Sequence, residues 1–324
     1  MSFKFLLICF AIFIALSISA LSIGGAEIGV GEILNFCLGK DIGEANETIL
    51  FDMRLPRLLM AILVGALLAT SGSVVQSVFL NPLADPYIIG IAAAATFGAV
   101  VAYLFGLDEI YYGVFAFICA TALSLTIFKL YRAGQSTATL LIIGIALSAF
   151  LGTFTSLAIY LIGEDSFKIT AWMMGYLGSA SWKKIALIVL PLTLSLIYFY
   201  MKRFELNVLL SGDDEAKTLG VDTRKSKKNL LIVSSLIVGF SVAFTGMIGF
   251  VGLIIPHTLR MLLNTSSNAV LIPASAIVGG LFLLFCDILA KSILAPIEVP
   301  IGVITSFFGA PFFLFLALKN RNIA

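Results

Sequence analysis

The chain has 324 residues, of which 60% are hydrophobic and 12% are charged, and its formal net charge is +2. Soluble domains carry about 25% charged residues, so this composition is typical of a polytopic membrane protein. The small net charge, without basic clusters interleaved with aromatic residues, argues against a nucleic-acid partner. The four cysteines form no C-x-x-C pattern, and the single histidine has no partner at metal-ligand spacing, so neither a disulfide framework nor a metal site is predicted.

An apolar run at residues 3–23 opens the chain. A secretory signal peptide would also carry such a run, and Ser19–Ala20 is small enough for cleavage. Because the run is longer than the apolar core of a signal peptide, we favour a retained first membrane span. Residues 24–57 follow and read as a polar connection with six acidic residues, which ends in the sequence RLPR.

Nine further apolar stretches predict membrane-spanning helices, so ten spans are expected in all. They lie at about residues 58–79, 88–106, 111–131, 139–162, 185–201, 230–247, 249–263, 270–290 and 300–318. Small residues at four-residue spacing, such as Gly65 with Ala69 and Gly144 with Ser148, predict close helix packing within lipid. The sequence therefore predicts an all-α, polytopic membrane protein that folds as one domain over residues 1–324.

Lysine and arginine are unevenly shared between the two sides of the predicted bundle. With the N-terminus in the cytoplasm and ten spans, 13 of them lie inside and seven outside. The positive-inside rule therefore predicts that both termini and residues 202–228 are cytoplasmic.

Residues 202–228, which we name the charged segment, hold 12 of the 38 charged residues (20 basic plus 18 acidic). A short helix is expected within the segment, with Ser211 and Asp214 as a capping box at its start. Gly220 is placed to end that helix, and Asp222 to cap the next one. Composition alone leaves two interpretations, an ordinary solvated loop or a docking element for a soluble partner.

Two irregular stretches interrupt the apolar pattern. Residues 81–86 read NPLADP, and the two prolines exclude a continuous helix, so the stretch is either a tight turn or a constriction that lines a cavity. Residues 246–260 contain Pro256, which is expected to bend or end its helix. His257 and Arg260 share a face near the cytoplasmic interface, where we favour anchoring over a proton relay.

Four charged residues are expected near the outer ends of spans. Asp287 is the one acid well inside a span, and Lys291 follows at i+4, so a structural ion pair near the outer mouth is predicted. Arg54 and Arg57 are either snorkelling anchors or contacts for an anionic partner outside, because positive-inside statistics disfavour arginine there. No G-x-x-x-x-G-K-[ST] pattern is present, so this chain is not expected to hydrolyse ATP by that route.

Taken together, these stretches resemble the FecCD-type permeases, the membrane subunits of ATP-binding cassette (ABC) importers for iron(III) chelates, haem and vitamin B12. The resemblance covers nearly the whole chain. Its specific parts are RLPR at 54–57, GALLATSGSVVQ at 65–76, NPLADPYIIG at 81–90, LLSGDDEAKTLGV at 209–221, GFVGLIIPH at 249–257 and PIGVITSFFGAPFF at 300–313.

The resemblance implies a ten-helix subunit of the bacterial inner (cytoplasmic) membrane that transports and is not an enzyme. It implies pairing with a second copy or a sister permease, two cytoplasmic ABC ATPase subunits and an extracytoplasmic substrate-binding protein. No cofactor is implied in this chain, because ATP would be bound by the partner subunits. The competing function class is an ion-gradient-driven secondary transporter that uses Asp287 or His257, and a membrane scaffold without transport is a third.

Three sets of site residues follow from the resemblance, position by position. The contact with the ATPase is implied at Ser211, Gly212, Asp213, Asp214, Glu215, Ala216, Leu219, Gly220 and Val221. A cytoplasmic gate is implied at Asn81, Leu83, Ser136 and Thr137. Docking of the substrate-binding protein is implied at Arg54, Arg57 and Lys291.

Overall fold

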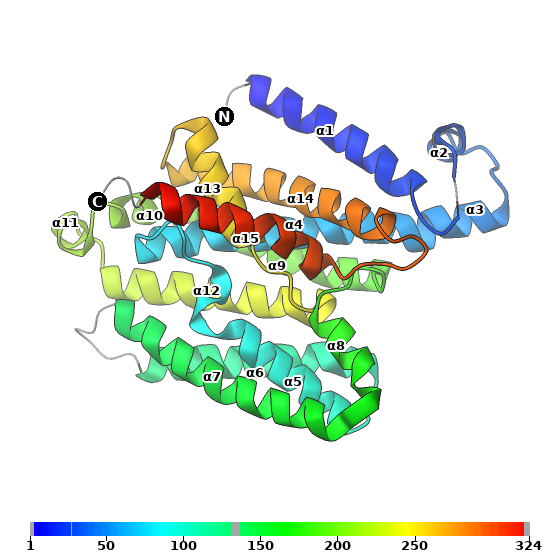
Figure 1. Cartoon of the computed structure of the whole chain (residues 1–324). Coiled ribbons are helices and arrows are strands. Elements are labelled where there is room, and N and C mark those ends of the chain that lie inside the picture. The colour runs from blue at the N-terminus through cyan, green and yellow to red at the C-terminus, as the bar shows by residue number, and fades with distance from the viewer. Residues whose placement is uncertain (1–2, 27, 131–136, 321–324) are drawn as a thin grey trace.

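The computed structural model describes residues 3–26, 28–130 and 137–320, and within these ranges it contains helices and no strands. A helix corresponds to each of the ten predicted spans (Figure 1). These are α1 (Phe3–Ser22), α4 (Leu55–Phe79), α5 (Ile91–Leu104), α6 (Glu109–Leu130), α7 (Thr137–Ile162), α9 (Trp182–Met201), α12 (Thr223–Thr245), α13 (Val251–Leu263), α14 (Asn268–Ser292) and α15 (Ile301–Asn320).

Seven helices in the described part of the chain are long and apolar enough to cross a membrane, judged by length and composition. Three further apolar helices are shorter, namely α5, α13 and the Ile301–Leu316 part of α15. Short helices complete the fold: α2 (Val30–Cys37), α3 (Glu44–Thr48), α8 (Phe167–Met173), α10 (Arg203–Leu209) and α11 (Asp213–Thr218). The predicted class, an all-α polytopic membrane protein, is confirmed.

The predicted polar connection at residues 24–57 is wrong in its second half. Helix α3, a π-helix at Ile49–Arg54 and α4 form one continuous helix from Glu44 to Phe79. Pro56 has no N–H to donate to the preceding turn, and the wider π turn directly before it accommodates the proline ring without ending the helix. The RLPR sequence therefore lies inside a helix, where two arginines three positions apart share a face.

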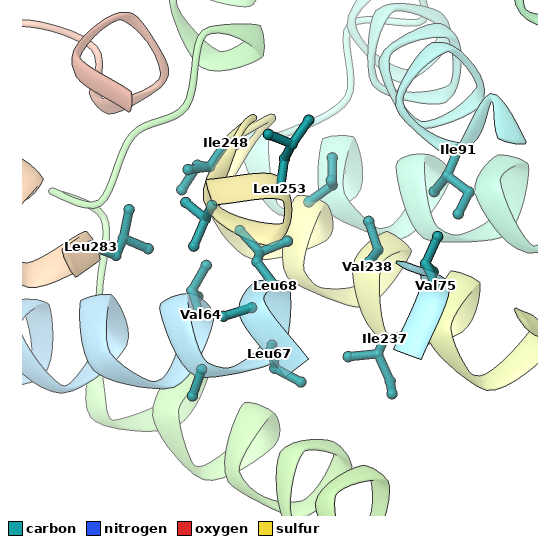
Figure 2. Close-up of a cluster of buried hydrophobic side chains, with 14 of the residues drawn as sticks. Val64, Leu67, Leu68, Val75, Ile91, Ile237, Val238, Ile248, Leu253 and Leu283 are labelled. Atoms are coloured by element: carbon teal, nitrogen blue, oxygen red, sulfur yellow. The ribbon is translucent and has the colours of Figure 1, made fainter. Parts of the chain in front are cut away.

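Helix α4 is the centre of the bundle. It packs against α14, α12, α13 and α9, and nearly every residue from Leu58 to Val78 is buried. Figure 2 shows Leu68 of α4, Val238 of α12 and Leu253 of α13 pointing into one cluster of apolar side chains. A helix that is buried on all sides has an apolar surface all round, so its position in the bundle cannot be read from an amphipathic pattern.

Small residues bring the helices into backbone contact, as their spacing predicted. A Cβ atom placed on Gly65 would lie 2.2 Å from the carbonyl oxygen of Gly279 in α14, and one on Gly279 would lie 2.4 Å from the Cβ of Ala69. Similarly, a Cβ on Gly90 would lie 2.3 Å from Oγ of Ser148 in α7. These crossings are tight because van der Waals packing, and not the exclusion of water, holds helices together in lipid.

The tightest crossing leads to a prediction about stability. A Cβ on Gly72 of α4 would lie 1.8 Å from the carbonyl oxygen of Gly252 in α13, so the two backbones must separate to admit a methyl group. We expect Gly72→Ala to destabilise the folded chain by about 1–3 kcal/mol, the usual cost of overpacking. A lower Tm of the detergent-purified protein is the measurement. Gly152→Ala in α7 is the matched control, because nothing lies within 4 Å of its added Cβ; equal Tm values for both variants would contradict the prediction.

Pro256 does not end its helix, contrary to one of the two outcomes predicted for it. Helix α13 runs through Pro256 to Leu263. A proline cannot donate to the carbonyl four residues earlier, which is that of Gly252. That carbonyl instead accepts a hydrogen bond of 3.3 Å from Nε2 of Gln76 in α4. The side chain of a neighbouring helix thus replaces the hydrogen bond that the proline removes.

Candidate functional site

The charged segment is folded along its length, with α10, α11 and the first turns of α12. The predicted capping box of Ser211 and Asp214 is wrong, because Gly212 takes the N-cap position of α11 and no side chain caps the helix. Gly212 has φ +104°, a conformation that favours glycine, so the backbone enters the helix one residue later than the side-chain pattern suggested.

The predicted end of α11 is confirmed. Gly220 has φ +81° and donates its N–H to the carbonyl of Lys217, and Val221 donates to the carbonyl of Ala216, both at 3.0 Å. These two bonds form the Schellman arrangement that closes a helix on a left-handed glycine. The side chain of Asp222 then accepts a hydrogen bond of 3.0 Å from the N–H of Lys225, which caps α12 as predicted.

Side chains fix α10 and α11 against the start of α12. Asp213 forms an ion pair of 2.5 Å with Lys227. Glu205 accepts hydrogen bonds from Lys202 at 2.5 Å and from Ser226 at 2.7 Å. Burial alone would raise the pKa of Glu205, but these two donors outweigh burial and hold the pKa below its ordinary value. The charged segment is therefore a fixed part of the fold and not a freely solvated loop.

Helix α11 presents an acidic surface to solvent. The side chain of Asp214 is 98% exposed, Glu215 is also exposed, and Leu219 beyond the helix is 66% exposed, whereas Ala216 is buried beneath them. Figure 1 places α11 at one end of the bundle, opposite the end that carries α2 and α3. The fixed support of α11 thus leaves its carboxylates and Leu219 open to solvent.

The charged segment is also joined to the core helices through Asn207 of α10. Its Oδ1 accepts hydrogen bonds from the backbone N–H of Asn268 at 2.8 Å and from Nδ2 of Asn268 at 3.1 Å. Asn268 is the first residue of α14, is fully buried, and accepts a hydrogen bond of 3.2 Å from Ser77 of α4. Asn207 thus supplies the N-terminal cap of α14 from another helix.

The sequence gives no local signal for this connection. Asn207 is 61 positions from Asn268, and Ser77 is 191 positions from it. Asn207, Asn268 and Ser77 meet only because the fold brings α10, α14 and α4 together.

The far end of α14 carries a group of charges, which we name the distal ion cluster. It consists of the largely buried Arg57, Asp287 and Lys291 and the partly exposed Glu298. Arg57 binds Asp287 at 3.0 Å and Glu298 at 2.7 Å. Lys291 approaches Asp287 at 3.4 Å, which confirms the predicted pair. The side chain of Asp287 is 1% exposed and that of Arg57 is 12% exposed. The dominant partner of Asp287 is therefore Arg57, 230 positions away, which the sequence did not reveal.

Arg54 is buried beside this cluster. Its guanidinium donates to the backbone carbonyls of Leu21, Ser22 and Ala26, so it holds the end of α1 and the turn after it. Neither Arg54 nor Arg57 reaches outward, so the interpretation of both as snorkelling anchors is wrong. The two arginines, Lys291 and Glu298 border a cavity of about 270 Å³. Their docking role remains a prediction.

The predicted gate is only partly described. Asn81 is exposed and Leu83 is half-buried, and Oδ1 of Asn81 accepts the N–H of Leu83 at 2.9 Å. Asp85 caps the 3-10 helix Pro86–Ile89 in the same way, so the stretch folds as a turn. Its role as a constriction is not decided by this turn. Ser136 lies outside the described residues, and only the backbone of Thr137, at the start of α7, is described. The gating role therefore remains a prediction.

The histidine and arginine of α13 also have structural roles. Arg260 donates a hydrogen bond to the side chain of Gln76, which ties α13 to α4. The ring of His257 lies edge-on to Phe312 of α15, with ring centroids 6.0 Å apart. Both residues thus contact neighbouring helices of the bundle.

A bundle of apolar helices, long enough in most cases to cross a membrane, with a fixed polar surface at one end and an ion cluster at the other, is the architecture of a multi-span membrane protein. The chain belongs to the FecCD transport family, whose model matches residues 10–319.

Known relatives cover nearly all of the chain. It is 36% identical over 322 residues to the hemin transport system permease protein of Yersinia pestis, across 96% of this chain and 95% of the relative. It is 36% identical over 301 residues to the vitamin B12 import system permease protein of Salmonella typhi, across 90% and 92%. A solved inward-facing ABC transporter, assigned to the metal-chelate type, superposes with a TM-score of 0.87 at 32% identity, across 98% and 99% of the two chains. The resemblance drawn from the sequence is confirmed.

Proposed function

We propose that this chain is the membrane permease subunit of an ABC importer that carries an iron(III) chelate, haem or cobalamin across the bacterial inner membrane. Separate ATPase subunits would hydrolyse the ATP, and both termini would be cytoplasmic. The observation that carries the proposal is the charged segment. Its exposed acidic helix α11 is fixed to α12 by the Asp213–Lys227 pair, and the preceding helix α10 is fixed to α14 by Asn207. A coupling element must be rigid in this way to transmit motion from a nucleotide-driven partner.

Partners follow from the two ends of the bundle. A second copy or a sister permease would complete the pathway. Two ATPase subunits would bind this pair, one of them at α11 of this chain and its flanking residues. An extracytoplasmic substrate-binding protein would dock at the distal ion cluster. Within that cluster we propose contacts for Arg57 and Lys291, because Glu298 on Arg57 is 35% exposed and its place can be taken by a carboxylate of the partner. Arg54, bound to three backbone carbonyls, would support the docking surface from beneath.

A bulky cargo is supported by the space at the same end. A cavity of about 750 Å³ is bordered by Tyr112, Trp172 and Tyr176, and Glu298 borders both this cavity and the smaller one at the distal ion cluster. Ligand sites commonly enclose about 300–1,000 Å³, so a metal chelate or a macrocycle is within reach of the larger cavity. The relatives named above are permeases for hemin and vitamin B12, and this supports a cargo of that size.

Charge reversal on α11 tests the proposal. Asp214→Lys with Glu215→Lys is expected to reduce co-purification of the ATPase subunit at least tenfold, because both carboxylates are exposed and reversal makes them repel a basic partner groove. Asp213 is kept, since it pairs with Lys227. Glu44→Lys with Glu47→Lys on α3, exposed at the opposite end, is the matched control. Undiminished co-purification would remove the proposed coupling surface.

The alternative, a transporter driven by an ion gradient, lacks an available carboxylate among the residues proposed for it. Both carboxylate oxygens of Asp287 are engaged, one by Arg57 and the other by Arg57 and Lys291. Uptake into vesicles that carry a proton or sodium gradient but no ATP separates the two functions. Gradient-driven uptake would favour the alternative, and uptake only with ATP and the ATPase subunits supports the importer.

A further inference from the structure

A groove between two membrane-spanning helices lies where α9 meets the charged segment. Helices α9 and α14 lie side by side there and leave a groove of about 460 Å³ between them. Its walls are almost wholly apolar, because aliphatic side chains of both helices form them. The groove is lined by Ile197, Tyr200, Met201, Ile272, Pro273 and Ala276.

A single arginine stands at the end of this groove. The guanidinium of Arg203 lies over the ring of Tyr200, 4.2 Å from its centroid, and donates a hydrogen bond of 2.8 Å to the Tyr200 carbonyl. In the part of the chain that the structure describes, no carboxylate pairs with Arg203, whereas neighbouring Lys202 is paired with Glu205. The flanking Met201 and Phe204 are 72% and 70% exposed. A half-buried cation between exposed apolar side chains is typical of the boundary between acyl chains and headgroups.

We infer that the α9–α14 groove and Arg203 form a binding site for an anionic phospholipid of the leaflet that faces the charged segment. An acyl chain would fill the groove, and the phosphate would accept hydrogen bonds from the free N–H groups of the guanidinium. Arginine suits this ligand because its planar donors match phosphate oxygens. Basic residues beside grooves between spans are known to hold anionic headgroups. The ligand is a lipid and not a free phosphate, because most of the contact surface is the apolar groove, which an acyl chain fills and a phosphate does not.

The site adjoins the coupling path. Arg203 is the first residue of α10, and Asn207 in the same helix caps α14, which forms the other wall of the groove. A bound lipid would therefore bridge the two helices whose relative position the charged segment sets. This inference needs only the membrane location of the chain, so it stands or fails separately from the proposed cargo and ATPase partners.

Lipid titration of the purified full chain tests the site. Binding of dioleoylphosphatidylglycerol and of dioleoylphosphatidylcholine is counted by native mass spectrometry. We expect tighter binding of the anionic lipid, and Arg203→Gln should weaken that binding about fivefold, as expected for one basic residue near an anionic headgroup. Lys129→Gln is the control, because Lys129 is an exposed cation at the end of α6, away from the groove; it should leave binding unchanged.

Four outcomes would overturn the inference. Equal binding of the two lipids would show that the site does not select an anionic headgroup. Equal loss of binding in Arg203→Gln and Lys129→Gln would show that the effect comes from the overall charge of the chain and not from Arg203. A second copy of the chain in the groove would be revealed by a cross-link between two copies of Ile277→Cys, since Ile277 also lines the groove. Ala276→Phe, which fills the groove, should weaken both lipids, and unchanged binding in that variant would also contradict the site.

Discussion

Replacing Asp287 with asparagine is expected to lower the free energy of unfolding by about 3–5 kcal/mol, the usual cost of removing one partner from a buried ion pair. The carboxylate is 1% exposed and is the shared partner of Arg57 and Lys291. Asparagine is nearly the same size, so packing is kept while the negative charge is lost. Two buried cations would then be left with Glu298 as their nearest acid within the distal ion cluster, and that carboxylate reaches only Arg57.

Thermal unfolding of the purified protein is the measurement for Asp287→Asn. Asp214→Asn is the control, because it removes the same charge from an exposed pair with Lys217, where little change in Tm is expected. A double variant with Arg57→Gln should recover part of the loss, since it removes one of the unpaired cations, and the coupling between the two sites should be non-additive. A Tm for Asp287→Asn equal to that of the unaltered chain would show that the cluster does not stabilise the fold.

The ten apolar helices could be predicted because hydropathy is a local property, and a helix in lipid must satisfy its backbone hydrogen bonds within its own segment. The start of the second span was misplaced because Pro56 and the acids before it indicated a loop, whereas the π turn at Ile49–Arg54 continues the helix. The central position of α4 could not be predicted, since apolar residues on all its faces are equally suited to lipid and to protein.

The contacts of the candidate site likewise fall into local ones, which could be predicted, and long-range ones, which could not. Asp287 with Lys291, and Asp222 as a helix cap, are neighbours in sequence and were predicted from spacing alone. Arg57 with Asp287, and Asn207 with Asn268, depend on how helices pack and were missed. The N-cap of α11 was a local error of a different kind, because a backbone conformation open to Gly212 prevailed over a side-chain motif.

Helix α14 joins the two ends of the molecule. It has 25 residues, which span about 37 Å at the usual rise of a helix. Its first residue is bound by Asn207 of the charged segment, and its last two turns carry Asp287 and Lys291 of the distal ion cluster. A rigid helix held at both ends can carry a displacement of the charged segment to the opposite side of the bundle. Removing the Asn207 cap of α14 should therefore break the connection between the charged segment and the distal ion cluster.

In the importer proposed above, replacing Asn207 with alanine is expected to reduce ATP-driven uptake about tenfold while the proposed ATPase subunits still co-purify. The change removes the Oδ1 that caps α14 and leaves buried Nδ2 of Asn268 without that acceptor. Loss of a helix cap costs about 1 kcal/mol, so the chain should still fold, but α10 would no longer hold α14. Uptake and co-purification are measured on the same preparations.

Asn207→Asp is the matched variant, because a carboxylate oxygen can accept both hydrogen bonds from Asn268 and favours a helix N-terminus. Uptake by this variant should remain close to that of the unaltered chain. Asn268→Ala should lower uptake as Asn207→Ala does, and the double alanine variant should lose little more, since both changes break the same connection. Additive losses, or loss of the ATPase subunits in Asn207→Ala, would show that Asn207 acts on assembly and not on the transmission of motion through α14.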